Sequence, residues 1–406
     1  MDEKRTILVS RGYDEEFLSL AQSLNFNILE TVYFKENTAK YFISFGKLEY
    51  IKKIKKIYNA ELLIINGELK STQWYNLEKE LQMEVEDRVR LIIEIFKDRA
   101  QSTEAMLETE LARMKYEIPL LKEWVHKSKK GEHPGFRASG EYDAAQYLDH
   151  IKKKIKKINE DLEKIKKQRA IQRNNRNEKG FYLVSLAGYT NSGKSTLMKD
   201  LSGEEVLIDG RMFSTLVPKI SKVKIKQKVL ITDTVGFIKD IPLWLIESFS
   251  ATLEEIYRSD LVLLIIDGND PLDVFITKFD ISYQILKEHS KSKIITIINK
   301  IDLKPLNLES KVEAIQKEGI EVILISAKQK ENVDKVFTAI EEAIDFDKEY
   351  SIVIKDNVDY GPLLSLIYEH GKFIKIEKKD RFYIMFKMSS KYNKKLQDLN
   401  YIYDLN

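Results

Sequence analysis

The strongest constraint in this sequence is a glycine-containing run that directly follows an apolar segment. Residues 181–188 read FYLVSLAG, and Gly188 begins a GxxxxGKS motif that ends at Lys194 and Ser195. Glycines allow backbone N–H groups to close around phosphate oxygens, and the N-terminus of a following helix adds positive potential. The run therefore predicts a strand, a phosphate-binding loop and a helix in succession.

Three side chains of this motif have expected roles. We expect Lys194 to reach the β- and γ-phosphates of a nucleotide and the Ser195 hydroxyl to ligate Mg²⁺. Asn191 has two interpretations, since it can coordinate a monovalent cation such as K⁺ or serve only the geometry of the loop. The candidate nucleotide contacts of this loop are Gly188, Tyr189, Thr190, Asn191, Ser192, Gly193, Lys194, Ser195 and Thr196.

A second motif, VLITDTVG at 229–236, places a carboxylate at the end of an apolar run. Asp233 can hold Mg²⁺ through water at such a strand end, and the Gly236 N–H can sense the γ-phosphate. Thr234 and Val235 lie between them and are candidate nucleotide contacts as well.

Two further motifs indicate which base is bound, IITIINKID at 294–302 and ILISAK at 323–328. The Asp302 carboxylate can accept from guanine N1 and its 2-amino group, whereas adenine offers neither donor, and an unpaired buried carboxylate is costly. A backbone N–H of the 323–328 motif can donate to guanine O6. The candidate base contacts are Asn299, Lys300, Ile301, Asp302, Ser326, Ala327 and Lys328. The four motifs in this order predict a GTPase with GTP and GDP as ligands.

Between the first and second motifs, RMFSTLVPK at 211–219 is the candidate switch segment. Thr215 is preferred over Ser214 as the switch residue that completes the magnesium shell, and part of this preference rests on the family resemblance described below. The candidate contacts of this segment are Phe213, Ser214, Thr215, Leu216 and Val217. The expected metal ligands are thus Ser195, Thr215 and Asp233, and the expected catalytic residues are Lys194, Thr215, Gly236 and Asn191.

Phe237 stands where many GTPases have a glutamine that orients the attacking water. A phenylalanine cannot do this. We therefore expect intrinsic hydrolysis to be slow, or the water to be positioned by another group or by a partner. Phe237 can also simply pack against the switch helix, and both interpretations can hold.

The rest of the chain divides by its pattern. Residues 5–66 alternate expected strands, one of them at 41–45, with helices, which predicts a small α/β domain. Apolar residues spaced three and four apart run from Leu107 to Val125 and again from Leu148 to Ile165. They predict two long helices in an antiparallel hairpin, with a glycine-containing tip at 128–141 and a linker at 173–180.

The expected fold class is α/β. A P-loop GTPase domain with a mostly parallel sheet follows a small α/β domain and the helical hairpin, and precedes a small α+β domain. The expected ranges are 1–100 for the N-terminal α/β subdomain, 101–178 for the hairpin, 179–347 for the GTP-binding domain and 348–406 for the C-terminal domain.

The second hairpin helix is basic. Residues 151–180 contain twelve Lys or Arg and four Asp or Glu, a local net charge of +8, while the whole chain carries only +3. This helix is either an ordinary solvated face or a surface for a phosphate backbone.

Composition excludes several classes of site. With no cysteine, the chain has no disulfide partner, thiolate metal site or cysteine nucleophile, and its five histidines lack metal-ligand spacing. The longest apolar run, 261–266, is far shorter than the ~20 residues of a membrane helix, so we expect no membrane span. We expect a cytoplasmic monomer.

The motifs together resemble the HflX family, translational GTPases of the Obg–HflX group. GYTNSGKSTL, FSTLVP, DTVGFI and IPLWLIESFSATLEEIYRSD are similar to its GTP-binding domain, and residues 76–121 to its N-terminal signature. The tip GFRASGE at 135–141 is similar to the family's glycine-rich loop, but it has Ser139 where proline is usual and departs again over 142–145.

The resemblance implies binding to the large ribosomal subunit and its rRNA, with a role in ribosome splitting, rescue or assembly. It also implies that ATP can be a further substrate. The alternative from the residues is a GTPase switch whose hairpin binds a protein or a small structured RNA.

Overall fold

The computed structural model describes residues 4–35, 38–129, 141–203, 219–225, 228–234, 236–239, 242, 244–245, 250–344, 348–354, 360–378, 382–388 and 392–399. The chain divides into two compact units. The first comprises residues 1–166, 209–217 and 238–252, and the second comprises 167–208, 218–237 and 253–406. Each unit is described by itself.

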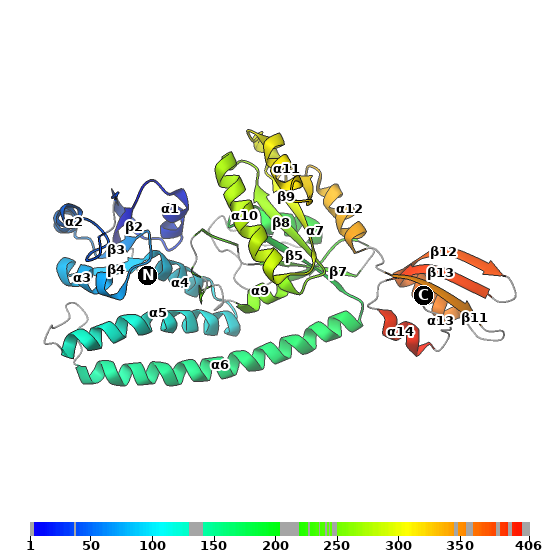
Figure 1. Cartoon of the computed structure of the whole chain (residues 1–406), viewed down its shortest axis with the longest axis horizontal. Coiled ribbons are helices and arrows are strands. Elements are labelled where there is room, and N and C mark those ends of the chain that lie inside the picture. The colour runs from blue at the N-terminus through cyan, green and yellow to red at the C-terminus, as the bar shows by residue number, and fades with distance from the viewer. Residues whose placement is uncertain are drawn as a thin grey trace. The chain divides into compact units, whose positions relative to one another are not determined.

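The first unit begins with a four-stranded parallel sheet of order β2-β1-β3-β4. Its strands are β1 (Arg5–Ser10), β2 (Asn27–Tyr33), β3 (Leu62–Ile65) and β4 (Glu84–Asp87), and its helices are α1 (Glu15–Gln22), α2 (Phe45–Tyr58), α3 (Ser71–Leu81) and α4 (Arg88–Arg99). The small α/β domain is confirmed (Figure 1).

The strand predicted at 41–45 is wrong. Residues 41–43 form turns and bends, Ser44 is the N-cap of α2, and α2 begins at Phe45. Tyr41, Phe42 and Ile43 are nevertheless buried in the core of this domain. Their apolar character therefore serves packing beneath a turn rather than strand pairing.

Two long helices follow, α5 (Thr103–Lys129) and α6 (Glu141–Glu178). Their seam contains the predicted residues: Leu111, Met114, Leu121, Ile151 and Ile158 are buried together. Most of the predicted tip, at 130–140, lies outside the described residues.

The linker predicted at 173–180 is wrong over most of its length, because α6 continues to Glu178. Arg173 pairs with Glu254 at 3.0 Å and Arg176 with Glu255 at 3.0 Å, which anchors these last turns of α6. Sequence periodicity could not show this, since the anchoring charges lie far along the chain.

The second unit contains a six-stranded sheet of order β10-β9-β8-β5-β7-β6. The strands are β5 (Tyr182–Gly188), β6 (Lys219–Lys222), β7 (Val229–Asp233), β8 (Leu261–Asp267), β9 (Lys293–Asn299) and β10 (Glu321–Leu324). Only the edge strand β6 pairs antiparallel among the pairs described here. The predicted, mostly parallel sheet is confirmed.

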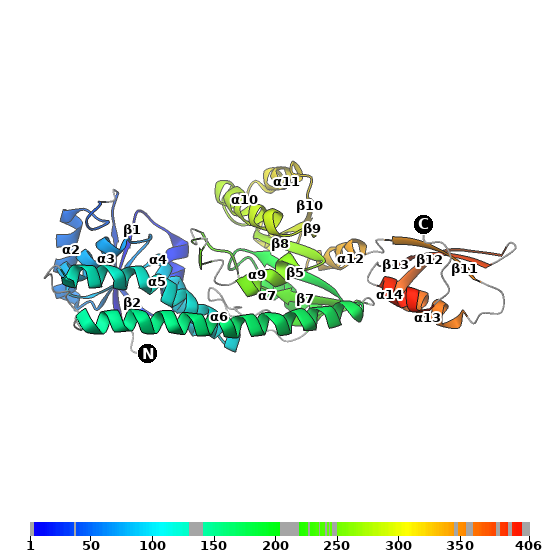
Figure 2. The same ribbon diagram turned by 60° about the horizontal axis from the view of Figure 1, so that its bottom comes forward.

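The helices of this sheet are α7 (Lys194–Ser202), α9 (Ser250–Tyr257), α10 (Leu272–His289), α11 (Leu308–Gln316) and α12 (Val333–Ala343). Residues of α7 and α12 share one buried core with the central strands. Helices α10 and α11 pack against each other (Figure 2). The apolar runs of the sequence thus form strands that are buried between helices.

The C-terminal part is a three-stranded antiparallel sheet of order β11-β13-β12. Its elements are β11 (Lys348–Ile354), α13 (Gly361–His370), β12 (Gly371–Lys378), β13 (Phe382–Met388) and α14 (Asn393–Asp398). The predicted order of strand, helix, two strands and helix is confirmed. In the described ranges of the whole chain, no helix has the length and apolar character needed to cross a membrane.

Candidate functional site

The glycine-rich run forms the predicted strand, loop and helix. β5 ends at Gly188 and α7 begins at Lys194, and we call residues 188–195 the P-loop. Gly188 has φ +142°, and a Cβ there would lie 2.1 Å from the Ile265 carbonyl oxygen. Gly193 has φ +99°, and its Cβ would lie 2.1 Å from Asn299 Nδ2. Both positions therefore require glycine.

Lys194 is buried, and its side chain folds back onto the beginning of the P-loop. Its Nζ donates to the carbonyls of Gly188 at 3.1 Å and Tyr189 at 2.8 Å. Burial lowers the pKa of Lys194 to about 8, and the Asp233 carboxylate offsets only part of this change. An anionic group beside Nζ would favour the charged form of Lys194 and offset the unfavourable effect of burial on that charge.

Ser195 and Asp233 meet across the first two motifs. The Ser195 hydroxyl donates a 2.6 Å hydrogen bond to Asp233 Oδ2, and Asp233 Oδ1 accepts the Thr234 N–H at 2.9 Å. Asp233 is buried at the end of β7. Two hard oxygen donors next to a phosphate-binding loop are ligands that Mg²⁺ prefers when phosphate and water complete its octahedron.

The P-loop fits a phosphate on two further observations. Ser192 Oγ is buried and has no hydrogen-bond partner among the residues described. A Cβ on Gly236 would lie 2.9 Å from Lys194 Nζ, so glycine leaves space beside this cation. No cluster of three or more His, Asp or Glu suited to a metal occurs in the described ranges.

Phe237 ties the second motif to the P-loop through its main chain. The Phe237 N–H donates to Gly188 O at 3.0 Å, and Phe237 O accepts the Thr190 N–H at 2.9 Å. The ring is buried and packs edge-on against Tyr189, with centroids 6.4 Å apart. The ring is therefore a packing group, but the contact that the structure shows is with Tyr189 of the P-loop; packing against the switch helix stays a prediction.

Asn299 joins three motifs. Its Nδ2 donates to Ser192 O at 2.9 Å, and its Oδ1 accepts the Ala327 N–H at 3.0 Å. Asn299 is buried at the end of β9. The structure thus brings the P-loop, the 294–302 motif and the 323–328 motif together at the carboxyl ends of neighbouring strands.

The side chains around the candidate base site are held in place. Ser326 Oγ donates to Asp302 Oδ1 at 2.7 Å, so the hydroxyl orients that carboxylate. Lys300 Nζ donates to Asp267 Oδ2 at 2.6 Å, and Lys300 has φ +68°. Both Asp302 and Lys300 remain partly exposed, whereas Ser326 is buried.

Sequence reasoning missed two groups beside this site. Asp267 ends β8 and pairs with Lys300, and its position after an apolar strand was a usable signal. Lys311 is buried and donates to the carbonyls of Gly268 and Leu306, each at 2.8 Å. No local pattern marks Lys311, because its two acceptors come from two separate loops.

The chain that follows Phe237 contacts the α/β domain of the first unit, to which residues 238–252 belong. Glu16 accepts the Lys239 N–H at 3.2 Å, and Arg88 donates to Lys239 O at 3.2 Å. The Arg88 guanidinium is buried and also pairs with Glu16. The sequence offered no signal for this contact.

Part of the predicted site lies outside the described residues. These positions are Phe213, Ser214, Thr215, Leu216, Val217 and Val235. Asn191 is described: it is exposed and has φ +61°. The remaining predicted positions lie in the expected elements. The P-loop contains Thr190 and Ser192, α7 contains Thr196, and the two base motifs contain Ile301 and Lys328.

Comparison with known families supports this geometry. Residues 13–97 match the family described as "GTP-binding GTPase N-terminal", and 99–176 match "GTP-binding GTPase Middle Region". Residues 183–300 match the family described as "50S ribosome-binding GTPase".

Several relatives cover most of the chain. It is 38% identical to GTPase HflX of Thermococcus kodakarensis over 377 residues, which cover 89% of this chain and 85% of the relative. It is 35% identical to GTPase HflX of Methanocaldococcus jannaschii over 363 residues, which cover 89% of this chain and 89% of the relative.

A solved structure is similar over much of the chain. The crystal structure of SsGBP in complex with GDP has a TM-score of 0.53 and 30% identity, and the match covers 84% of this chain and 98% of that one. This GDP-bound structure and the relatives named GTPase HflX agree with the four assembled motifs. The chain therefore belongs to the HflX family of GTPases.

Proposed function

We propose that this protein is a GTP-hydrolysing switch that acts on the large ribosomal subunit. The observation that carries the nucleotide part is the placement of Asp302, whose carboxylate is oriented by Ser326 beside the P-loop. The ribosomal part rests on the family described as "50S ribosome-binding GTPase", which residues 183–300 match, and on the charge of α6.

Guanine recognition is assigned to the two base motifs. Asp302 accepts from the two donors on one edge of guanine, and a backbone N–H near Ala327 donates to O6. Asn299 connects these motifs to the P-loop, since it accepts from the Ala327 N–H and donates to Ser192 O. The proposed base contacts are Asn299, Lys300, Ile301, Asp302, Ser326, Ala327 and Lys328.

Phosphate binding is assigned to the P-loop and to Lys194. The lowered pKa of Lys194 supports this, because burial disfavours its charge and, among the described residues, Asp233 is the one carboxylate that offsets this effect. Ser195 and Asp233 would hold Mg²⁺, with Thr215 as the proposed third protein ligand. When bound, Mg²⁺ neutralises negative charge on the β- and γ-phosphate oxygens.

Hydrolysis is proposed to be slow in the free protein. Phe237 has no group that orients water, and its ring is buried against Tyr189. Asn191, Lys194, Thr215 and Gly236 are the proposed catalytic residues, with K⁺ bound beside Asn191 and ATP as a further substrate. Equal rates of GTP hydrolysis in K⁺ and in Na⁺ would refute the proposed K⁺ site at Asn191.

Ribosomal RNA is the proposed partner of α6. Seven lysines of this helix are exposed, while Ile151 and Ile158 of the same helix are buried in the seam. These lysines are Lys152, Lys153, Lys156, Lys157, Lys164, Lys166 and Lys167. The charges therefore face solvent, as a surface for phosphates requires.

A route for nucleotide control is available in the first unit. The Lys239 backbone, two residues after Phe237, is bound on both sides by Glu16 and Arg88. A change in the chain at Gly236 would alter these contacts. We propose that the nucleotide state reaches the N-terminal domain in this way.

Sedimentation with isolated large subunits tests the proposal. The protein is loaded with GDP, with GTP or with a non-hydrolysable GTP analogue, and pelleting is compared with that of small subunits. We expect pelleting with large subunits that depends on the nucleotide. Equal partition in all states, or binding only to a protein or to a small RNA, would favour the alternative partner for the hairpin.

A further inference from the structure

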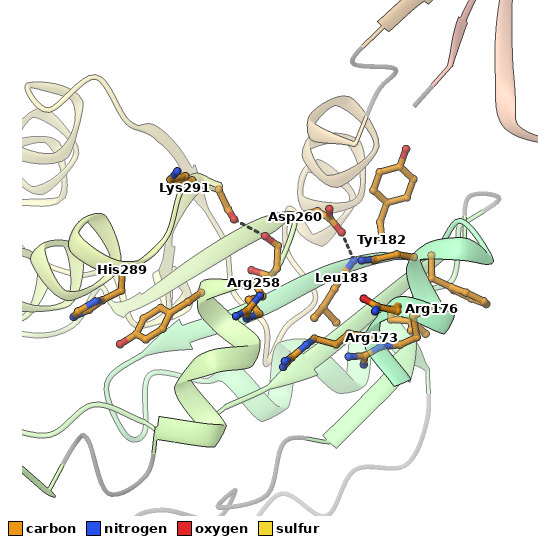
Figure 3. A pocket seen from close by; sticks show the side chains of 15 residues that line it. Arg173, Arg176, Tyr182, Leu183, Arg258, Asp260, His289 and Lys291 are labelled. Carbon is orange, nitrogen blue, oxygen red and sulfur yellow. Dashed lines mark hydrogen bonds between the residues drawn. The ribbon is translucent and has the colours of Figure 1, made fainter. Parts of the chain in front are cut away.

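The second unit contains a cavity at the end of the sheet opposite the P-loop. It has a volume of about 480 Å³ and is lined where β5, β8 and β9 begin. Ligand pockets in proteins span roughly 300–1,000 Å³. Figure 3 shows Arg173, Arg176, Arg258, His289 and Lys291 around this cavity.

Two of these cations are already committed to the fold. Arg173 Nη2 lies 3.0 Å from Glu254 Oε1, and Arg176 Nη2 lies 3.0 Å from Glu255 Oε2. The Glu255 side chain is only 6% exposed. These pairs hold α6 against α9 and form a wall of the cavity, so they are not available to a ligand.

Two other cations remain available. The Arg258 side chain is 61% exposed and uses only its Nε toward Glu254, at 2.9 Å. Lys291 is exposed. Across the described part of the chain, neither Lys291 nor the terminal nitrogens of Arg258 have an ion-pair partner. A guanidinium and an ammonium that line the same cavity suit a phosphate group.

An aromatic pair stands beside these cations. The rings of Tyr257 and His289 have centroids 4.9 Å apart at 39°. The Tyr257 hydroxyl is neutral near pH 7 and can donate, and burial raises its pKa further, to about 12. Rings of this kind serve as stacking surfaces for unstacked bases.

We propose that this cavity binds one unstacked nucleotide of a single-stranded RNA segment. The phosphate is held by Arg258 and Lys291, and the base stacks on the Tyr257–His289 pair. The choice of RNA rests on the proposed ribosomal function. An acidic peptide would satisfy the two cations but leave the aromatic pair unused.

Binding of a short fluorescent single-stranded RNA to the GDP-saturated full chain tests this site. GDP keeps the probe out of the P-loop. Reversing both Arg258 and Lys291 to glutamate is expected to weaken binding by at least about tenfold. The matched control reverses Lys317 and Lys335, which are exposed on the same unit and lie outside the cavity, and is expected to bind like the wild type.

Tyr257→Leu removes the stacking ring without changing charge. It is expected to weaken RNA binding by about fivefold or more. GDP affinity and the melting temperature of each variant establish that it is folded. If Tyr257→Leu does not fold, the charge-reversal pair carries the test. Equal losses in the cavity pair and in the control pair would overturn the proposal.

Cross-linking and competition experiments distinguish the cavity from α6 as the RNA-binding site, and RNA from a free nucleotide as the ligand. RNA that contains 4-thiouridine is expected to cross-link to residues 257–260 or 289–292. Cross-links confined to the lysines of α6 overturn the cavity proposal and leave the proposed function standing. Conversely, RNA binding in the cavity without sedimentation on large subunits would refute the proposed function alone. If AMP binds as tightly as the RNA and displaces it fully, the ligand is a free nucleotide and the commitment to RNA fails.

Discussion

The side-chain amide of Asn299 donates a 2.9 Å hydrogen bond to the carbonyl of Ser192, which joins the end of β9 to the P-loop. The same side chain accepts from Ala327 at 3.0 Å. Because the amide is buried, these partners have no ready access to water. One residue therefore links the proposed base site to the proposed phosphate site.

Replacing Asn299 should weaken both binding and folding. Asn299→Ala leaves the Ser192 carbonyl and the Ala327 N–H unsatisfied, at about 1–3 kcal/mol for each buried group. We expect GTP affinity to fall by at least about tenfold. Titration with a fluorescent GTP analogue and a thermal melt measure the two effects. The control Asn269→Ala changes an exposed asparagine of the same unit and should leave both unchanged.

Guanine specificity should depend on Asp302. Asp302→Asn replaces an acceptor with a donor that opposes the guanine edge, so GTP affinity should fall by at least tenfold, about 1.4 kcal/mol. Preference should shift toward xanthine nucleotides. Ser326→Ala removes only the 2.7 Å hydrogen bond that orients the carboxylate and should cost less. Affinities for GTP and XTP decide this, and a mutant with unchanged GTP affinity would refute the assignment.

Phe237 should matter through its main chain and not through its ring chemistry. Phe237→Leu keeps both backbone hydrogen bonds to the P-loop, so single-turnover hydrolysis should change only modestly. Gly236→Ala is the informative contrast, since its Cβ would lie 2.8 Å from the Thr190 nitrogen. That variant should lose hydrolysis. A drop of several orders of magnitude for Phe237→Leu would contradict the prediction.

Reversing exposed lysines of α6 should abolish ribosome binding but preserve GTP affinity. Lys152, Lys156, Lys157 and Lys167 are changed to glutamate; all four are exposed and outside the hairpin core. Binding through phosphates releases counterions, so the wild-type interaction should also weaken steeply with salt.

The matched control for that experiment reverses four exposed lysines of the GTP-binding domain, Lys287, Lys317, Lys330 and Lys335. It changes the net charge equally and should still sediment with the large subunit. If the α6 variant also sediments at physiological salt, its basic face is only a solvated surface, and the contact must be sought elsewhere.

Glu86 should make the N-terminal domain less stable as pH rises. Burial raises the pKa of Glu86 to about 7 from 4.5, despite the opposing effect of Arg90. The folded state therefore binds the extra proton, so stability is fully present below pH 4.5 and is lost as pH rises through about 7. Glu86→Gln should raise the unfolding free energy at pH 8 by on the order of 2 kcal/mol and have little effect at pH 4.

Urea unfolding followed by fluorescence measures this effect. The chain has three tryptophans, and replacing Trp124 and Trp244 by phenylalanine leaves Trp74, which donates to Val85 O at 2.7 Å next to Glu86. Glu68→Gln is the control, because Glu68 is exposed. A Glu86→Gln variant with the same stability difference at both pH values would contradict the linkage.

Local sequence was sufficient for the elements of the GTP-binding domain. Each of its motifs directly follows an apolar run, and such runs form buried strands because a parallel sheet is covered on both faces. Glycine at 188 and 193 is required by left-handed backbone and close approach, which are also local properties. The seam of the hairpin was predictable for the same reason, since its spacing of three and four matches the helical period.

Elsewhere the sequence pattern was insufficient. Glu84–Asp87, with the sequence EVED, is a strand only because β3 pairs with it, and residues 41–43 are apolar without being a strand. The last turns of α6 looked like a linker, yet they are held by Glu254 and Glu255. In each case the deciding partner is distant along the chain.

The sequence alone thus determined the order of elements, the nucleotide-binding motifs and the choice of guanine, because these depend on local periodicity, on backbone freedom and on which side chain follows which strand. Only the tertiary structure decided that Asn299 would connect three loops, that Lys311 would be buried, and that Tyr257, Arg258, His289 and Lys291 would line one cavity. These relationships arise where separate strands and helices end at the same place, and packing, not neighbouring sequence, brings those ends together.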